Sequence, residues 1–267
     1  MHSRLKFINM KEYKNFEFSN SHNEILRGKL FLPESNGIKP PVVFMMTGDG
    51  KKGSNGLSWI NLPKLFLEKG IASFVFDFSG LGTSEGKRKD LNLSKAISDS
   101  QIAFNFLLKL EEVDVANVGI FAASFGGNVA ILSFSKNENI KAMALKSPVS
   151  FYPDSFMEEF GLDKVLKWKK VRYLEEIGFN YEFYIDSLKH NSYELATNIS
   201  FPCLIVHGDN DEIVPVNQSR HLFNALINSP TPVLKIKKGV DHRYSLPGAW
   251  DEMALDSVLF LTDELTR

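Results

Sequence analysis

One serine stands at the centre of a small-x-Ser-x-Gly pattern, between an apolar run and a helix-like stretch. Residues 119–127 read Gly-Ile-Phe-Ala-Ala-Ser-Phe-Gly-Gly, with Ser124 at the centre, Ala122 two residues before it and Gly126 two after. A strand that turns directly into a helix strains the serine backbone, so only small residues fit at those two positions. The turn would expose the hydroxyl and leave the Phe125 amide free to stabilise an oxyanion. The pattern therefore predicts that Ser124 is a catalytic nucleophile, and the alternative is an ordinary helix N-cap.

A serine nucleophile needs an imidazole to take its proton and a carboxylate to fix the imidazole tautomer. In a strand-turn-helix architecture these partners follow the serine in the order Asp, then His. The apolar run at 201–206 predicts a short buried strand, and it continues directly into the loop 207–215. We therefore expect the acid in that loop.

The next strand-like run, at 233–236, is followed by a loop that contains His242. His242 is therefore the predicted base. The other histidines, which we expect to be structural, are His2, His22, His190, His207 and His221.

With these motifs in place, nearly the whole chain resembles the α/β-hydrolases, of the esterase, dienelactone hydrolase and serine aminopeptidase-like type. Residues 207–215 are similar to the family pattern His-Gly-x-x-Asp-x-x-Val-Pro, and this resemblance implies that Asp211 is the acid. Asp209 is the competing candidate, at a position where a turn carboxylate usually caps local amides. Residues 239–242 resemble the family's Gly-x-x-His, which implies the base role for His242.

A further match lies after the strand-like run that ends at Met46. Thr47-Gly48-Asp49-Gly50 stands where the family usually has His-Gly-x-x, so the resemblance implies that this loop supplies a second oxyanion amide. By position the expected donor is the Asp49 N–H, with Gly50 as the alternative. Thr47 in place of His and the acidic Asp49 depart from the usual pattern, and a plain glycine-rich turn is the competing interpretation.

Residues 77–86 are similar to the family loop Asp-x-x-Gly-x-Gly-x-Ser-x-Gly, for which we expect a scaffolding role. Two phosphate-binding motifs are incomplete in this sequence, so neither kind of site is predicted. Residues 48–54 have P-loop glycine spacing, but Ser54 stands where the lysine is required. Glu85 occupies the third glycine position of a dinucleotide fingerprint.

The order of the predicted elements indicates an α/β fold. Strand-like runs occupy 16–19, 25–32, 42–46, 71–76, 118–121, 142–145, 203–206 and 233–236. Helical patterns occupy 59–69, 94–110, 125–135, 217–227 and 250–262. The first two strands should form an antiparallel edge, and the alternation that follows predicts a mostly parallel central sheet with helices on both faces.

The alternation breaks at 147–200, which is longer, charged and rich in aromatic residues. The resemblance implies a small inserted cap here, over a core made of 1–146 and 201–267. Such a cap would overhang Ser124 and provide an apolar or aromatic acyl pocket, although most of its aromatic side chains should be structural. Its basic side chains are expected to form a solvated face, and they are Lys167, Lys169, Lys170 and Arg172.

Composition is that of a globular enzyme. The 267 residues are 43% hydrophobic and 24% charged, with a formal net charge of −1, so no basic footprint for nucleic acid is present. The single cysteine, Cys203, excludes an internal disulfide and is expected to be a small buried residue. We find no metal-ligand motif, no apolar run of transmembrane length and no signal-peptide core at the N-terminus. These observations predict a cytoplasmic protein with no metal, cofactor, membrane or nucleic-acid partner, and they leave the oligomeric state open.

The sequence predicts a serine hydrolase that cleaves a carboxylic ester through an acyl-enzyme, on a small apolar or aromatic acyl substrate. A thioesterase, an acyltransferase and an aminopeptidase use the same triad, so these alternatives stay open. A hypothesis from another class is a ligand-binding protein that keeps the fold without catalysis.

Overall fold

The computed structural model describes residues 13–34 and 37–267, so His2 and the N-terminal segment examined for a signal peptide lie outside the described residues. Within the described ranges the strands form one sheet with the order β1-β2-β4-β3-β5-β6-β7-β8. The strands are β1 (Lys14–Ser19), β2 (Ile25–Phe31), β3 (Pro41–Met46), β4 (Ala72–Asp77), β5 (Asp114–Ala123), β6 (Ile140–Lys146), β7 (Cys203–Gly208) and β8 (Pro232–Lys237).

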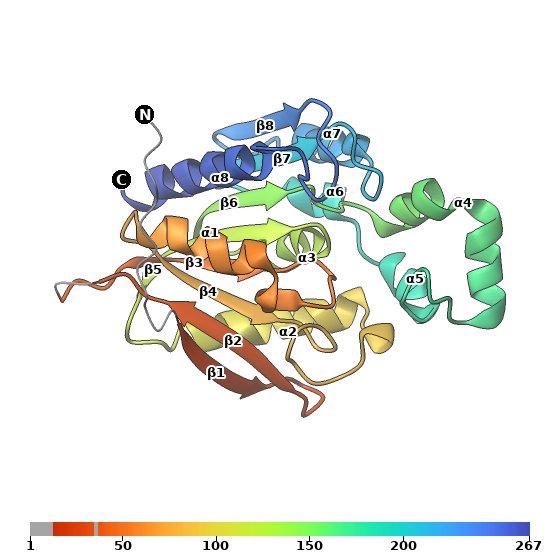
Figure 1. The fold of residues 1–267 in the computed structure, drawn as a ribbon, viewed down its shortest axis with the longest axis horizontal. Coiled ribbons are helices and arrows are strands. Elements are labelled where there is room, and N and C mark those ends of the chain that lie inside the picture. Colours follow the sequence, from red (N-terminus) through yellow and green to blue (C-terminus); the bar gives the residue numbers. More distant parts are fainter. Residues whose placement is uncertain (1–12, 35–36) are drawn as a thin grey trace.

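The sheet is antiparallel at one edge and parallel elsewhere. β1 pairs with β2 and β2 with β4 in antiparallel fashion, whereas every other neighbouring pair from β4 to β8 is parallel. Because parallel strands end at the same edge, the loops that follow β3, β5, β7 and β8 are brought to one end of the sheet (Figure 1). This is the usual position of ligand sites in open α/β sheets.

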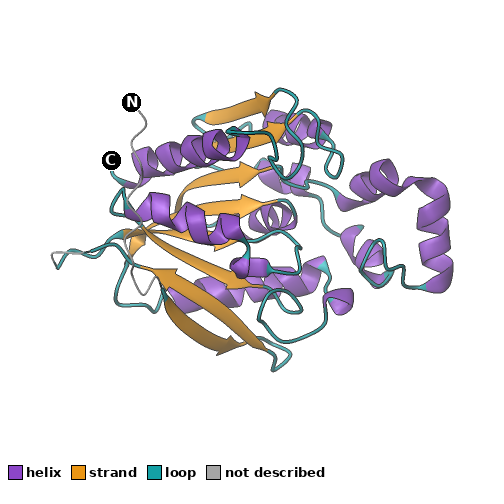
Figure 2. Ribbon diagram, viewed as in Figure 1, coloured by secondary structure: helices purple, strands orange, loops and turns teal. Residues whose placement is uncertain are grey.

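Helices cover both faces of the sheet (Figure 2). α1 (Leu57–Leu67) and α8 (Ala249–Leu265) pack on one face. α2 (Leu93–Leu107), α3 (Phe125–Phe134) and α7 (Val216–Ala225) pack on the other. Short 3₁₀ helices lie at η1 (Gly53–Asn55) and η2 (Arg88–Asp90).

Burial on both faces explains why the central strands read as continuous apolar runs. In β3, Val42, Phe44 and Met46 pack into the core under α2 and α3. Val43 and Met45 point to the opposite side and pack under α1 and α8. All five side chains are buried, as expected for a parallel strand covered by helices on both sides.

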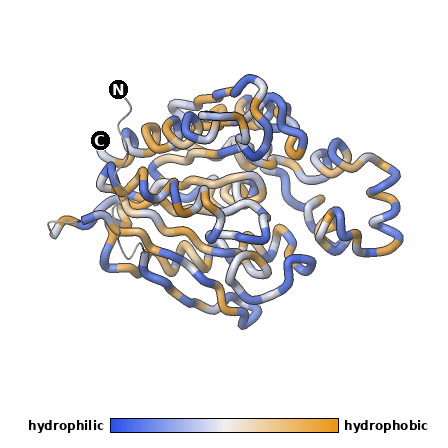
Figure 3. Tube along the Cα trace, in the orientation of Figure 1, coloured by the Kyte–Doolittle hydropathy of each residue, from blue (hydrophilic) through white to orange (hydrophobic). Residues whose placement is uncertain are grey.

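The segment between β6 and β7 contains three helices with different surroundings. α4 (Tyr152–Val171) and α5 (Glu182–Ser187) project beyond the end of the sheet (Figure 1). Gly161 breaks the helical backbone inside α4, with φ 72° and ψ 163°. α6 (Ser192–Ala196) packs against α3 and α7 of the core. The outer part of α4 carries many hydrophilic residues (Figure 3). We keep the name cap for 147–200, whose boundaries stay a prediction.

The predicted fold class is confirmed: the sheet is mostly parallel, open, and covered by helices on both faces. The predicted burial of Cys203 is confirmed too, and this burial raises the pKa of its thiol to about 12. No helix within the described ranges has both the length and the apolar character needed to cross a membrane. The cytoplasmic location stays a prediction.

Candidate active site

Ser124 is the only residue between β5 and α3, and its backbone is strained. Its φ is 52° and its ψ is −117°, in a region that non-glycine residues seldom occupy. The turn is held because the Ser124 amide donates to the Lys146 carbonyl at 2.9 Å and the Ser124 carbonyl accepts from the Val149 amide at 3.2 Å. The hydroxyl does not cap the first amides of α3. Ser124 is therefore not a side-chain N-cap, which was the competing interpretation.

Close packing beneath the turn explains the small residue after the serine. A methyl group on Gly126 would lie 2.4 Å from the Thr47 carbonyl oxygen and 2.5 Å from that of Met46. Backbone atoms cannot move aside as a flexible side chain can, so glycine is required for α3 to begin against the end of β3. The same packing places the loop after β3 beside Ser124.

Asp211 and His242 are hydrogen-bonded to each other. His242 Nδ1 donates to Asp211 Oδ2 at 2.7 Å, and this bond leaves Nε2 as the free ring nitrogen. The Asp211 side chain is fully buried, and the ring of His242 is mostly so. Asp211 Oδ1 accepts from the amides of Ile213 at 3.0 Å and Val214 at 2.8 Å, so four donors surround this carboxylate.

His207 is the fourth donor, although the sequence predicts a purely structural role for it. It is fully buried, and its Nε2 lies 3.0 Å from Asp211 Oδ2 and 2.9 Å from the Val214 carbonyl. Because both partners are acceptors, Nε2 carries the proton, and Nδ1 accepts from the Ser219 hydroxyl at 2.6 Å. The first position of the His-Gly-x-x-Asp pattern was the available signal, since it places this ring beside the acid.

The surroundings of Asp211 favour its ionised form. Burial alone would raise the pKa of the carboxyl, but hydrogen bonds from His207 and His242, the charge of His242 and the Val214 amide together hold it well below its ordinary value. A carboxylate that stays ionised can fix the Nδ1–H tautomer of His242 and stabilise the imidazolium form.

Asp209, the competing acid, lies elsewhere in the same loop. It is exposed, and its Oδ1 accepts from the Gly239 amide at the start of the histidine loop. This is the local capping arrangement expected of a turn carboxylate. The structure thus brings Asp211, and not Asp209, to His242.

Lys146, at the end of β6, connects the serine turn with the histidine loop. Its carbonyl accepts from the Ser124 amide, and its Nζ donates to the His242 carbonyl at 2.7 Å. The ammonium also lies over the Tyr244 ring, 4.6 Å from the centroid. Burial lowers the pKa of Lys146 to about 8, although the carboxylates of Asp211 and Asp241 act in the opposite direction. One residue therefore contacts the backbones of both Ser124 and His242.

The loop after β3 lies against Ser124. A methyl group on Gly48 would stand 3.5 Å from Ser124 Cβ and 4.0 Å from Ser124 Oγ. Across residues 13–34 and 37–267, the amides of Asp49, Gly50 and Phe125 donate no hydrogen bond. Free amides beside the serine are what an oxyanion hole requires, and both candidates in the loop, Asp49 and Gly50, have this property.

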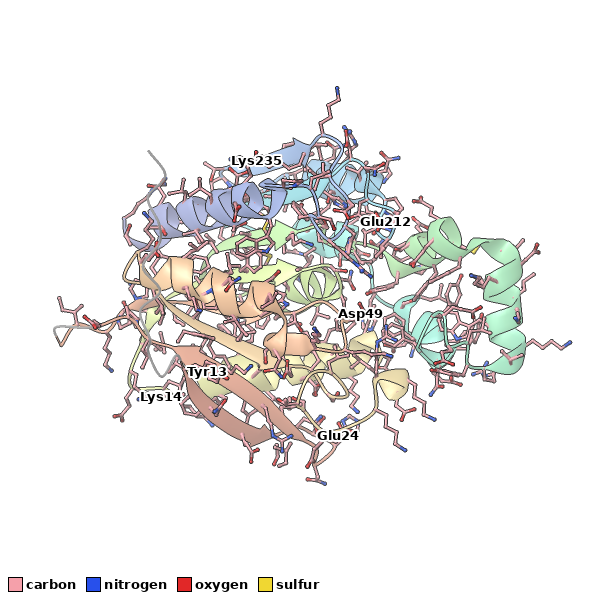
Figure 4. All side chains as sticks on the ribbon, in the orientation of Figure 1. Tyr13, Lys14, Glu24, Asp49, Glu212 and Lys235 are labelled. Atoms are coloured by element: carbon pink, nitrogen blue, oxygen red, sulfur yellow. The ribbon has the colours of Figure 1, made fainter. Side chains whose placement is uncertain are left out.

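Aromatic side chains of the cap reach the nucleophile turn. The Phe125 ring lies 6.3 Å from the rings of both Tyr152 and Phe183, centroid to centroid. Trp168 is fully buried between α4 and α5, where its indole N–H donates to the Phe179 carbonyl at 2.9 Å. Figure 4 places Asp49 and Glu212, the neighbour of Asp211, at the end of the core that faces α4 and α5.

Asp77 has the scaffolding role predicted for its loop. It is fully buried and accepts from the Ser54 amide at 2.6 Å and from the Thr83 amide at 3.0 Å. In the part of the chain that the structure describes, no group of three or more His, Cys, Asp or Glu side chains is arranged to hold a metal ion.

The sequence pattern of the prolyl oligopeptidase family matches residues 62–265, which is most of the chain. The chain belongs to this family. Its fold agrees, because the structure of Est1E from Butyrivibrio proteoclasticus with bound ferulic acid superposes with a TM-score of 0.79, at 21% identity over 94% of this chain and 100% of that one.

Two named proteins match parts of this prolyl oligopeptidase family member in sequence. The polyketide transferase claH of Penicillium crustosum is 27% identical over 67% of this chain and 58% of its own length. The thiohydrolase aneE of Aspergillus aculeatus is 32% identical over 45% of this chain and 37% of its own length. The chain thus aligns with little more than half of the first relative and less than half of the second.

Replacing Asp211, the predicted acid, which contacts His242, should impair turnover selectively. Asp211→Asn keeps the shape but favours the wrong imidazole tautomer, so we expect kcat for ester hydrolysis to fall by up to about 10⁴-fold at neutral pH. Asp209→Asn is the matched control and should lower kcat far less. Steady-state kinetics on both variants checks this, and the reverse ranking would transfer the acid role to Asp209.

The Lys146 contact yields a second prediction. Lys146→Met removes the donor to the His242 carbonyl. We expect kcat to fall by roughly 10²-fold with little change in KM, because displacement of the predicted base slows proton transfer in the chemical step without altering substrate binding. Lys29→Met is the matched control, since Lys29 Nζ also donates to a backbone carbonyl, that of Ser54, and lies over the Tyr13 ring away from the site. Equal losses of kcat in the two variants would show that Lys146 does not act on catalysis by positioning His242.

Proposed function

We propose that this member of the prolyl oligopeptidase family is a serine hydrolase that cleaves a carboxylic ester through a covalent acyl-enzyme. The observation that carries the proposal is the strained turn at Ser124, tied through Lys146 to the loop that bears the Asp211–His242 pair. Backbone strain of this kind has a cost of order 1–3 kcal/mol and persists where the surrounding structure enforces it, often at functional sites.

In the acylation step, His242 Nε2 takes the proton of the Ser124 hydroxyl while Oγ attacks the ester carbonyl carbon. The carbonyl oxygen becomes an oxyanion, which accepts hydrogen bonds from the amides of Phe125 and Asp49. The tetrahedral intermediate then expels the alkoxide, which takes the proton from His242 and leaves as the alcohol. Asp211 stabilises the transient imidazolium through Nδ1–H and remains ionised.

Deacylation repeats these steps with water. His242 takes a proton from water, the hydroxide attacks the acyl carbon, and the second tetrahedral intermediate releases the acid as Ser124 recovers its proton. In these steps each bond that forms is balanced by one that breaks. The proposed reaction uses no cofactor.

The cap supports an apolar or aromatic acyl group as substrate. Tyr152 and Phe183 are buried around the Phe125 ring, so they hold the cap against the nucleophile turn, where its apolar surface would meet a bound acyl group. Est1E, which shares the fold, binds ferulic acid, an aromatic acid, in its solved complex. Contact with this surface would contribute about 25 cal/mol for each Å² of apolar substrate area removed from water.

A second candidate is thioester cleavage or acyl transfer, which the names of the thiohydrolase and the polyketide transferase favour. An aminopeptidase uses the same triad. Matched oxyester, thioester and anilide substrates with one acyl group discriminate among them, because acylation differs only in the leaving group. A kcat/KM higher for the thioester than for the oxyester would favour the second candidate, and an added alcohol acceptor would reveal transfer.

The nucleophile is tested by Ser124→Ala. The variant should lose roughly 10⁴-fold or more in kcat for ester hydrolysis, because the attacking oxygen is absent. Alanine still fits the entrance to α3, so the folded state should persist in circular dichroism. Steady-state hydrolysis of an acetyl ester and an aromatic ester measures the loss.

Retention of more than about a tenth of the wild-type kcat would move the nucleophile elsewhere. Wild-type protein that binds acyl compounds but shows no turnover of esters, thioesters or anilides would instead indicate a ligand-binding protein on this fold.

A further inference from the structure

Arg88, in η2, holds both the backbone and the side chain of Asp49. Its Nε donates to the Asp49 carbonyl at 3.2 Å, and its Nη2 forms an ion pair with the Asp49 carboxylate. The Arg88 side chain is 24% exposed and that of Asp49 36% exposed, so the pair is partly removed from water. Two donors on one planar guanidinium hold both the Asp49 side chain and the peptide between Asp49 and Gly50, whose N–H belongs to Gly50, which a single point charge could not do.

The same guanidinium contacts the cap. Its Nη1 donates to the Ile177 carbonyl across a long 3.5 Å contact, and its Cζ lies 4.2 Å from the centroid of the Phe179 ring. The residue between these two is glycine, with φ 78°. A methyl group on Gly178 would lie 1.7 Å from Arg88 Nη1, so the guanidinium occupies the space that any other side chain would need.

Other contacts dock the cap on the same region but do not extend to Asp49. Asn180 donates through its amide to the Lys89 carbonyl and through its side chain to Asp90, each at 2.8 Å. Asp186 accepts from the amide and hydroxyl of Ser94 at 2.8 and 2.7 Å. Arg88 therefore differs from its neighbours because it contacts both the cap and the loop beside Ser124.

We propose that Arg88 is a positioning residue that holds Asp49 by its carbonyl and its carboxylate, and thereby sets the neighbouring amides of Asp49 and Gly50 as oxyanion donors whose position depends on the docked cap. The inference rests on the proposed function. Gly48, next to Asp49, lies against Ser124, so a small movement of Asp49 displaces the N–H groups of Asp49 and Gly50 relative to the serine. A partly exposed ion pair contributes little to the free energy of unfolding, so orientation is the larger effect of Arg88.

The pairing with Arg88 accounts for the presence of an acidic residue at Asp49, where the chain departs from the family pattern. A carboxylate next to a forming oxyanion would repel it unless its charge were compensated. The Arg88 guanidinium supplies that compensation, because its Nη2 is paired with the carboxylate. Asp49 and Arg88 thus form one unit, in which Arg88 holds the residue whose own amide and whose following amide are the two candidate donors.

The test uses the full-length protein with a minimal acetyl ester that is too small to depend on the cap aromatics. Arg88→Met and Arg88→Lys should both lower kcat by roughly 10²-fold with KM nearly unchanged, because an oxyanion donor acts in the transition state. Lysine keeps the charge but not the paired donors, so failure of Arg88→Lys to restore kcat separates orientation from charge.

Arg172→Met is the matched control. Arg172 also pairs with a carboxylate, that of Glu182, and also lies over an aromatic ring, that of Tyr181, but within the cap alone. Its variant should keep the wild-type kcat. Ser94→Ala, which removes a cap-docking hydrogen bond that does not reach Asp49, should do the same.

Gly178→Ala tests the dependence on the cap without removing Arg88. The added methyl group should displace the guanidinium, so this substitution in the cap should also lower kcat for the acetyl ester by at least tenfold. The proposal is overturned if the folded Arg88 variants and Gly178→Ala keep wild-type kcat, or if Arg172→Met lowers kcat equally. Failure of the proposed function is distinguishable, because Ser124→Ala would then retain turnover as well.

Discussion

The one-residue turn between β5 and α3 is the constraint on which the rest of the site depends. Ser124 can hold a φ of 52° only because its amide and carbonyl are bonded to neighbouring backbone and because α3 begins directly against the end of β3. That close approach requires glycine at position 126. It also fixes the loop after β3 beside the serine, so one packing contact positions both the hydroxyl and the free amides around it.

Two basic side chains connect this arrangement to other parts of the structure. Lys146 ties the serine turn to the loop that carries His242, and Arg88 ties the Asp49 loop to the cap. Both act on backbone carbonyls, which sets the position of a peptide rather than of a side chain. Burial lowers the pKa of Lys146 to about 8, because an ammonium group loses hydration free energy when it is removed from water at this point in the fold. Such a cost is consistent with a role in geometry rather than in stability.

The fold could be predicted from local sequence patterns. The continuous apolar runs of strands covered on both faces, and the turns that contain glycine, can each be recognised within a short segment. The loops that bear Ser124, Asp211 and His242 could be predicted in the same way, since each directly follows a strand. Arg88 and Lys146 could not, because their partners lie far away in the sequence and a lone basic residue has no local signature. His207 is intermediate, since it begins the loop motif but its contact with Asp211 depends on the folded turn.

The most direct test of the account is the site of covalent labelling by a fluorophosphonate, located by peptide mass spectrometry on the native protein. An activated serine loses its proton to the base and forms a bond to phosphorus as the P–F bond breaks and fluoride leaves, so the account predicts one adduct, on Ser124. The Asp211→Asn variant should label much more slowly. An absence of labelling, or an adduct on a different residue, would contradict the claim that the strained turn presents a catalytic nucleophile.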